Sequence, residues 1–370
     1  MKTKIKNALK SPYFYVFMLF PLGILLLAAA KYVPGFAQWY YENIYYYLGG
    51  LYGSISGLFP FSLMEAAICA GIFLLVYWFI KAVLKRKEGS KAVLKHLCAV
   101  LMRVLSVASA VFFLFSVFCG TNYHRESFSE YIGLEVKASS VDELYDLCEF
   151  LILETEKYGE NLLHDENGTT VFAPSDFIMA NTARTEFEKF AENHGLEKMG
   201  FFRFGTPKPV FFSEVMAYLK ISGVFSPYTF EANINSAGPD FLRGSTMMHE
   251  QSHLYGFMNE AESNFIAYLA SVESENDYFR YSGTCLALLY SMNALYSADY
   301  ERWYELRIRY PEYVSADMAA QNAYVAAHET KVAEVSDAVN DTYLKLNDQK
   351  DGVRSYGKMV DLLLAYRRTV

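Results

Sequence analysis

Three long stretches of apolar residues occupy the first third of the chain. Pro12 to Ala30 contains no charged residue and is long enough to cross a bilayer as a helix. Phe61 to Ile80 carries only Glu65, near its beginning, and Leu97 to Cys119 carries only Arg103, also near its beginning, where a long side chain can reach the lipid headgroups. The pattern predicts three transmembrane helices, at about residues 12–30, 61–80 and 97–119.

The first stretch has an alternative interpretation. It ends in Ala28-Ala29-Ala30, a small-residue pattern at which a secretory signal could be cut. Its apolar run is longer than the core of a usual signal, so we favour an uncut membrane anchor. Either interpretation places the loop that follows on the same side of the membrane.

The basic residues predict the orientation of the spans. Four lysines precede the first stretch and six basic residues separate the second from the third, whereas Lys31 is the only base between the first and the second. Basic loops favour the cytoplasmic side. We therefore expect a multi-pass protein of the bacterial cytoplasmic (inner) membrane. Its N-terminus would be cytoplasmic, and everything after Cys119 extracytoplasmic.

Aromatic residues are concentrated in the loop at residues 31–60. Such residues collect at membrane–water interfaces because their rings are apolar and their tips polar. The loop predicts an interfacial helix or a re-entrant segment; a surface that stacks on a ligand, or a roof or floor for the domain that follows, is the alternative. The aromatic residues are Trp39, Tyr40, Tyr41, Tyr45, Tyr46, Tyr47 and Tyr52.

After residue 120, apolar residues recur mostly at helical spacing, including one long stretch from Ser315 to Leu346. The exception alternates apolar and polar residues, which is typical of a strand with one buried face. Its residues are Phe230, Glu231, Ala232, Asn233, Ile234 and Asn235. We predict a mainly α fold with a small β-sheet (α+β). Residues 1–120 would form a membrane domain, and residues 121–370 a helix-rich extracytoplasmic domain.

Composition and charge support this division. Apolar residues make up 53% of the chain and aromatic residues 17%, which is high for a soluble protein. Residues 1–120 carry a net charge of +9 and the remainder −17. So acidic a domain is repelled by anionic lipid and is a poor candidate for binding nucleic acid. Cys148 and Cys285 fall outside the spans and could pair, although two buried free thiols are the simpler interpretation.

The most specific chemical signal is the pentapeptide from His249 to His253, which has the pattern H-E-x-x-H. On a helix, positions i and i+4 share a face, so both imidazoles can reach one metal ion. Glu250 lies beside them, where its carboxylate can accept a proton from a water that the metal activates. Ser245 is a suitable N-cap for this helix, and Gly256 is suited to its C-terminal end. The pattern predicts a site for one zinc ion with Glu250 as general base.

A third ligand is expected from the next helix, which Asn259 can cap. Glu260 lies in its first turn, and Asn264, one turn further on, could orient a ligand. Glu262 is the competing ligand, but a capping-box pattern with Asn259 already gives it a structural role. We favour Glu260.

Two further roles can be assigned only as candidates. The strand at Phe230–Asn235 could bind an extended substrate through its backbone, although an ordinary half-buried strand fits the pattern equally well. A donor to the negative charge that develops on a substrate carbonyl could come from Tyr228, Arg354 or Tyr356. For each of these, packing or surface exposure is the alternative.

Several blocks of the sequence resemble a bacterial family, the domain of unknown function 3810 family. The blocks are the three N-terminal spans, Ser226 to Asn233, the H-E-x-x-H helix with Gly256, Glu260 to Phe265, Asn340 to Lys345, Asp351 to Val353 and Ser355 to Gly357. The resemblance implies a membrane-anchored, zinc-peptidase-like (gluzincin-like) protein, and its Glu-x-x-x-Asp/Asn arrangement implies Glu260 and Asn264. Ser252 and Ser263 stand where the family usually has alanine, and both are small enough to fit.

The sequence therefore predicts a membrane-anchored zinc metallopeptidase that hydrolyses peptides or exported proteins. Its expected partners are the lipid bilayer and a peptide or protein substrate. The alternative is a non-enzymatic membrane sensor or scaffold that retains a zinc site. Glu250 favours the enzyme, because a structural zinc site does not need a free carboxylate beside its ligands. Other divalent metals remain compatible with two histidines and a glutamate.

Overall fold

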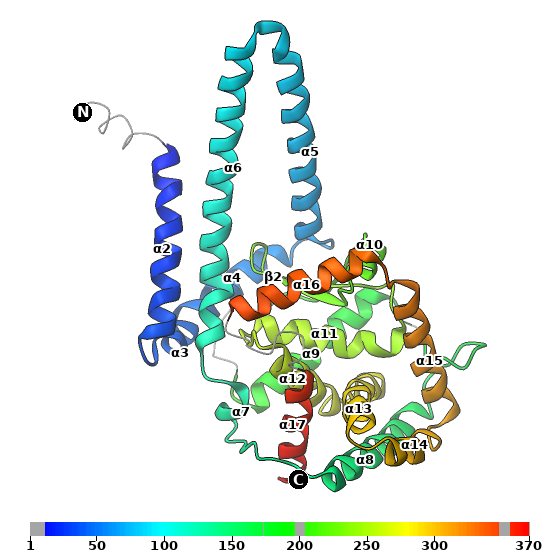
Figure 1. The fold of residues 1–370 in the computed structure, drawn as a ribbon. Helices are drawn as coiled ribbons and strands as arrows, with labels where there is room; N and C mark the ends of the chain where they lie inside the picture. Colours follow the sequence, from blue (N-terminus) through cyan, green and yellow to red (C-terminus); the bar gives the residue numbers. More distant parts are fainter. Residues whose placement is uncertain (1–11, 173, 197–203, 348–355, 370) are drawn as a thin grey trace.

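The computed structural model describes residues 12–172, 174–196, 204–347 and 356–369. Three of its helices are long and apolar enough to cross a membrane: α2 (Pro12–Tyr32), α5 (Leu63–Leu84) and α6 (Ser90–Phe118). Helices α5 and α6 form a hairpin through the short 3-10 helix η2 (Lys85–Glu88), and α2 packs along α6 (Figure 1). Helices α2, α5 and α6 correspond to the three predicted stretches, and α6 begins at Ser90, earlier than the predicted residue 97.

The aromatic loop is helical and belongs to the protein core. It forms α3 (Phe36–Tyr40), the π-helix η1 (Tyr41–Tyr45) and α4 (Tyr46–Ser56). Its tyrosines 40, 41, 45 and 46 are buried, whereas Trp39 and Tyr47 are exposed, so one side of the segment packs on the body and its place at a membrane interface stays a prediction. The Tyr45 hydroxyl donates to the carbonyl of Leu254, 3.0 Å away, at the end of the H-E-x-x-H helix. The loop thus forms part of the floor beneath that helix, which was the alternative.

The rest of the chain is a mainly helical body below the candidate membrane-spanning helices, with a small sheet. Helices α7, α9, α13 and α17 pack against α11 or α12, α8 packs against α13, and the C-terminus lies at the far end from the α5–α6 hairpin (Figure 1). Its helices are α7 (Phe128–Tyr131), α8 (Val141–Gly159), α9 (Asp176–Asn193), α10 (Ser213–Tyr218), α11 (Arg243–Leu254), α12 (Glu260–Val272), α13 (Asp277–Ala298), α14 (Tyr300–Arg307), α15 (Glu312–Ala327), α16 (Lys331–Leu346) and α17 (Tyr356–Arg367). The mainly α fold with a small sheet is confirmed. Cys148 and Cys285 are buried free thiols.

The single stretch predicted from Ser315 to Leu346 is two helices. Helix α15 ends at Ala327, and Thr330 begins α16 as its N-cap by accepting a hydrogen bond from the backbone N–H of Ala333. The capping threonine was visible in the sequence, but the apolar spacing continued across it. The break lets α16 turn back across the body toward α6 (Figure 1).

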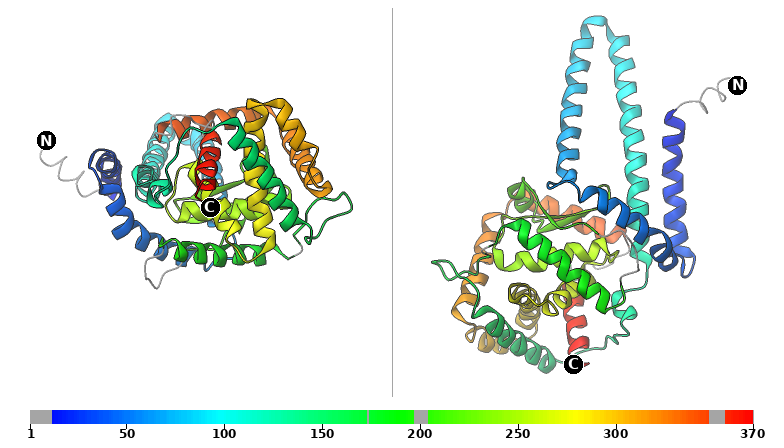
Figure 2. Two further views of the ribbon diagram at one scale, coloured as in Figure 1. Left: turned by 90° about the horizontal axis from the view of Figure 1, so that it is seen from below. Right: turned by 180° about the vertical axis from the view of Figure 1, so that it is seen from behind.

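The sheet has three strands in the order β1–β3–β2: β1 (Lys208–Pro209), β3 (Glu231–Ile234) and β2 (Gly223–Ser226). It lies between the lower end of α5 and helix α11 (Figure 2). Strand β3 pairs in parallel with β1 and antiparallel with β2. The predicted strand therefore exists, but it is central, and its backbone is already paired on both sides. This contradicts its assignment as the substrate-binding strand.

Both faces of β3 are buried, not one as predicted. Glu231 and Asn233 are buried because the polar face meets the beginning of α5. The Glu231 carboxylate accepts the backbone N–H groups of Leu63 and Met64, at 3.1 and 3.0 Å, and pairs with the buried Lys208 ammonium. A charge-paired network thus joins the sheet to the first turn of α5, a candidate membrane-spanning helix.

Candidate metal centre

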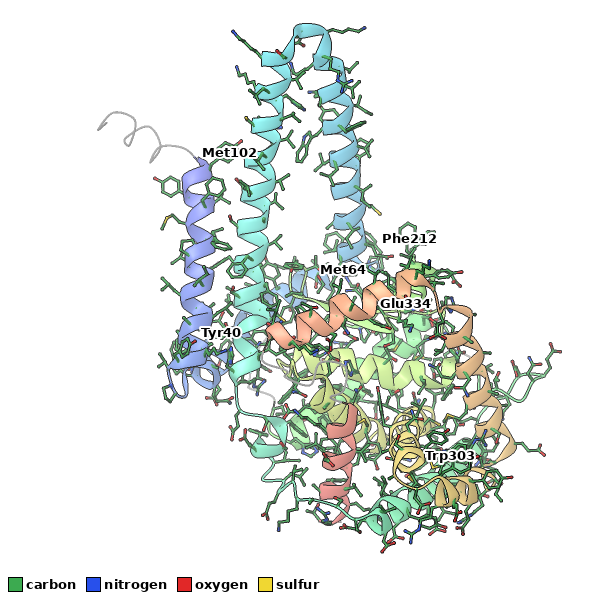
Figure 3. The ribbon with its side chains drawn as sticks, viewed as in Figure 1. Tyr40, Met64, Met102, Phe212, Trp303 and Glu334 are labelled. Atoms are coloured by element: carbon green, nitrogen blue, oxygen red, sulfur yellow. The ribbon has the colours of Figure 1, made fainter. Side chains whose placement is uncertain are left out.

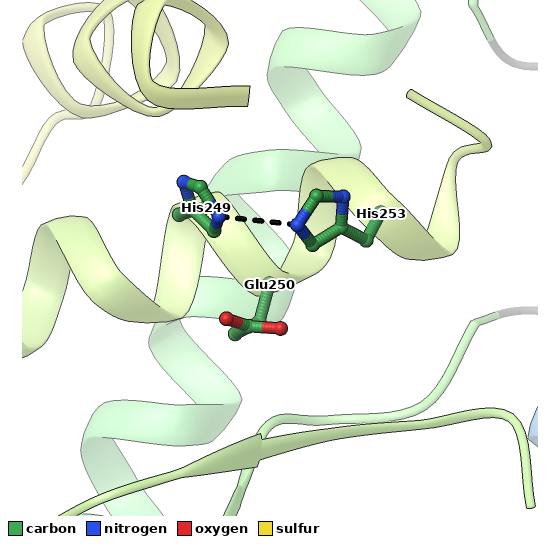
Figure 4. A group of neighbouring side chains, drawn as sticks. All are labelled: His249, Glu250 and His253. Atoms are coloured by element: carbon green, nitrogen blue, oxygen red, sulfur yellow. Dashed lines mark hydrogen bonds between the residues drawn. The ribbon is translucent and has the colours of Figure 1, made fainter. Parts of the chain in front are cut away.

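Helix α11 presents His249, Glu250 and His253 to one side (Figure 4). The helix begins two residues before the predicted cap Ser245, because the 3-10 turn η4 (Asp240–Leu242) runs directly into it. The Ser245 hydroxyl bonds back to the Leu242 carbonyl. At the other end, Gly256 adopts a φ of 80° and lets the chain reverse into α12.

The reversal brings Glu260 to the two histidines. The Nε2 atoms of His249 and His253 are 3.1 Å apart, and the Glu260 carboxylate lies 3.2 Å from the first and 3.8 Å from the second. Four-coordinate zinc holds its ligand atoms about 3.3–3.5 Å apart, since its bonds to N and O are about 2.0–2.2 Å long and tetrahedral. The shorter distance is to Glu260 Oε2 and the longer one to Oε1, so the two imidazole nitrogens and this carboxylate have spacings close to those of ligands around one small cation.

The hydrogen bonds behind the imidazoles determine which nitrogens face the site. His253 Nδ1 donates to the Phe257 carbonyl at 2.6 Å, and His249 Nδ1 donates to Asn264 Oδ1 at 2.8 Å. In the neutral rings, both Nε2 atoms then carry lone pairs directed at each other and at a carboxylate. Such an arrangement repels itself unless a positive charge lies between the atoms. The residues thus fit a divalent cation such as zinc.

The pKa values show the same attraction for positive charge. Burial lowers the pKa of His249, but its hydrogen bond to Glu260 and the charge there outweigh burial and raise it to about 9. Burial raises the pKa of Glu260, but the two histidines outweigh it and lower it to about 2. Burial and the neighbouring His249 lower the pKa of His253 to about 4. The Glu260 carboxylate thus favours a positive charge at His249, and a bound cation would supply that charge instead.

The Glu250 side chain lies close to both histidines, separately from the Glu260 carboxylate. One ligand atom each of His249, Glu250 and His253 lies within 4.8 Å of the other two. The Glu250 side chain is buried, and its Oε2 atom has no hydrogen-bond partner among the described residues. Burial raises its pKa to about 8. A buried carboxylate with an unused oxygen is a chemically poised base.

Strand β2 passes close against Glu250. A Cβ atom at Gly223 would lie 2.5 Å from Glu250 Oε1, so only glycine leaves the carboxylate its place. In the described part of the chain β2 pairs only with β3, which leaves its other edge open. Gly223, Val224 and Phe225 line the same cavity as the metal-site residues. The open edge of β2, not β3, is therefore beside the site.

The competing carboxylate, Glu262, points elsewhere. Burial raises its pKa to about 7, and its hydrogen bonds run to the backbone N–H of Phe128 and to Ser127. Asn259 does cap α12, accepting from the N–H groups of Ala261 and Glu262. Of the two glutamates, the structure brings only Glu260 to the histidines.

The site opens into a cavity of about 730 Å³. Its walls include β2, the end of α10, α15 and α16. Tyr123 and Tyr343 both line it, and the Tyr123 hydroxyl donates to that of Tyr343 at 3.1 Å. The Tyr343 hydroxyl also lies 3.6 Å from Cys119 Sγ, and either atom of that pair could be the donor.

None of the predicted oxyanion donors is placed at the site. Tyr228 is 41% exposed and is not among the cavity-lining residues. Arg354 and the side chain of Tyr356 lie outside the described residues. Tyr123 and Tyr343 were missed, although Tyr343 belongs to the Asn340–Lys345 block that carries the family resemblance. Nothing local in the sequence marks either tyrosine as close to the histidines.

Asn264 gives a first test of this geometry. We expect Asn264→Ala to weaken zinc binding about 10–100-fold, because His249 loses the acceptor that fixes its ring and tautomer. Zinc affinity is measured by competition with a chromophoric chelator. Asn259→Ala, which removes a cap from the same helix, is the matched control and should cost stability but little affinity. Equal affinity in wild type and Asn264→Ala would contradict the assignment.

The fold and site together describe a largely helical protein with candidate membrane spans and a potential two-histidine, one-glutamate metal site. Residues 40–364 match the family described as proteins of unknown function (DUF3810), and the chain belongs to this family. No curated protein and no solved structure matches the chain.

Proposed function

We propose that the protein is a membrane-anchored zinc peptidase that hydrolyses peptides or exported proteins. One observation carries the proposal: three lone-pair atoms from α11 and α12 converge beside a buried carboxylate that has an unused oxygen. A purely structural metal site uses all its ligands and gains nothing from such a neighbour. This favours an enzyme over a sensor or scaffold.

Each residue then has a defined task. His249, His253 and Glu260 would hold zinc, which when bound polarises a carbonyl and makes water more acidic. Glu250 takes the proton from the attacking water and passes it to the leaving amine. An extended substrate would add to the open edge of β2 through backbone hydrogen bonds, a common mode of peptide recognition.

Tyr343 is the candidate donor to the developing oxyanion. We expect Tyr343→Phe to lower kcat about a hundredfold, with KM and zinc content unchanged, since an oxyanion donor acts mainly in the transition state. Tyr123→Phe is the matched control, because it removes the neighbouring hydroxyl only. A lower kcat in Tyr123→Phe but not in Tyr343→Phe would show that Tyr123, not Tyr343, is the donor.

The direct test measures turnover and metal together. Purified full-length protein is loaded with zinc, its metal content is measured, and a broad peptide library is analysed by mass spectrometry before and after incubation. We expect cleavage that a chelator stops and added zinc restores. Bound zinc without any cleavage would favour the sensor or scaffold.

The proposed location is the bacterial inner membrane, with the N-terminus in the cytoplasm and the catalytic domain outside. A reporter enzyme that is active only in an extracytoplasmic compartment, fused after Val370, should be active. A fusion in the α5–α6 turn, after Gly89, should be inactive. The reverse pattern would refute the orientation.

A further inference from the structure

We propose that the protein has a second membrane-contact surface, separate from its spanning helices. It consists of the outer side of the Phe211–Phe212 turn and α10, together with the outer apolar face of α16. Its partner is the lipid at the headgroup–acyl boundary of the leaflet where α5 enters the bilayer. The inference rests on α5 and α6 crossing the membrane and does not require the protein to be an enzyme.

The first part of this surface is a group of exposed apolar side chains around α10. Phe211 is 86% exposed, an unusual state for a phenylalanine in water. Its neighbours Phe212, Val215 and Tyr218 are 48%, 55% and 46% exposed. Contiguous exposed apolar residues of this kind mark contact with a protein or a membrane.

Hydrogen bonds fix the position of this turn relative to the membrane. The backbone N–H groups of Phe211 and Phe212 both donate to the Glu65 carboxylate, at 2.9 Å each. Glu65 lies in the first turn of α5, none of whose side chains is buried. The turn therefore lies at the level where α5 enters the bilayer. Figure 3 shows Phe212 beside the lower end of α5, near Met64.

The turn cannot move freely away from that level. Lys208, just before it, pairs with Glu231, and Glu231 accepts the N–H groups of Leu63 and Met64 at the beginning of the same helix. The segment from Lys208 to Phe212 is thus linked to α5 at both of its ends, through Glu231 at Lys208 and through Glu65 at Phe211 and Phe212. A membrane that embeds α5 brings its interface to Phe211.

Helix α16 supplies the second part of the surface. Val332, Val335 and Val339 follow at positions i, i+3 and i+7, on one face, and are 57%, 64% and 64% exposed. An amphipathic helix that exposes its apolar face is typical of a helix lying in a membrane interface. Ala333 and Leu344, by contrast, are buried on the side of α16 opposite Val335, and this side packs on the body. Ser336, between the two sides, donates to the Leu219 carbonyl at 2.7 Å.

The arrangement of the helices selects lipid as the occupant. Helix α16 crosses below α5 between α6 and α10, and the lower ends of α2 and α6 extend past it (Figures 1 and 2). A membrane interface at the start of α5 therefore lies close to α16 (Figure 1). The domain is acidic, so the contact depends on apolar area and not on anionic headgroups.

The surface also has a consequence for the cavity. Ser336, Asn340 and Tyr343 of α16 line the cavity that contains the metal site, and Val339 lies at its rim, between the cavity and the outer face. The same helix thus separates the cavity from lipid. Lipid contact would hold α16 over the metal site, so access to it would depend on the membrane surface.

The test uses full-length protein in phosphatidylcholine nanodiscs that contain one protein each. Phe211→Cys or Val335→Cys, in a Cys69→Ser/Cys98→Ser background that keeps only the buried Cys119, Cys148 and Cys285, carries an environment-sensitive fluorophore. Ile308→Cys, at an exposed position (66%) on the body, is the matched control. Quenching is compared for lipids with brominated chains and for aqueous iodide, and an unchanged Tm verifies the fold of each variant.

We expect brominated lipid to quench the labels at Phe211 and Val335 several-fold more than the label at Ile308, and iodide to quench them several-fold less. Iodide quenching equal to that at Ile308 would overturn the proposal. Protection from iodide without quenching by brominated lipid would also overturn it, because it would show that protein covers the surface.

Discussion

Replacing Glu250 with glutamine is expected to abolish peptide hydrolysis and to leave zinc bound. Glutamine has the same shape as glutamate, so it fits into the space that the absence of a side chain at Gly223 leaves for residue 250. It cannot accept a proton from water. General-base catalysis contributes about 10²–10⁴-fold, so kcat should fall by at least that range. The three atoms that would hold the metal are unchanged, so zinc content should be that of wild type.

The matched control is Glu262→Gln. It makes the same chemical change two residues after Glu260, but its carboxylate bonds to Ser127 and the Phe128 N–H instead of facing the histidines. Kinetics on a cleaved library peptide and metal analysis are run on both variants. Equal turnover by wild type and Glu250→Gln, each with zinc bound, would refute the assignment of Glu250 as the base.

The second large effect is expected from Glu260→Ala, which should lose zinc. Removing one of three ligands leaves two imidazoles and takes away the carboxylate that pairs with both of them. The affinity should fall by more than the about 10–100-fold that follows loss of a residue that only orients a ligand. Glu262→Ala should keep zinc and lose only a modest amount of stability.

Thermal unfolding of the purified proteins provides a readout that does not depend on activity. A ligand that binds only the folded state stabilises it by about 2.7 kcal/mol when its free concentration is about 100 times Kd. Zinc should therefore raise the Tm of wild type and Glu262→Ala, and a chelator should reverse the change. Glu260→Ala should show no zinc-dependent shift. A shift lost in Glu262→Ala and kept in Glu260→Ala would reverse the ligand assignment.

Local sequence patterns were insufficient where one segment covers another. The alternation in Phe230–Asn235 correctly predicted a strand, but alternation cannot say which strands lie on either side of it. Here β1 and β2 occupy both edges, and the start of α5 buries the polar face. Similarly, aromatic rings suit a membrane interface and a protein core equally well, and Tyr45 lies in the core.

The sequence by itself determined the features that depend on neighbours along the chain. Long apolar runs define the three candidate spans, because crossing a bilayer needs only length and hydrophobicity. The i, i+4 spacing of His249 and His253 places both rings on one helix face. The tertiary structure alone decided that Glu260 and not Glu262 meets them, that β2 passes beside Glu250, and that α16 covers the cavity. These contacts join segments far apart in the chain, and they depend on how the helices and strands pack, which local spacing does not encode.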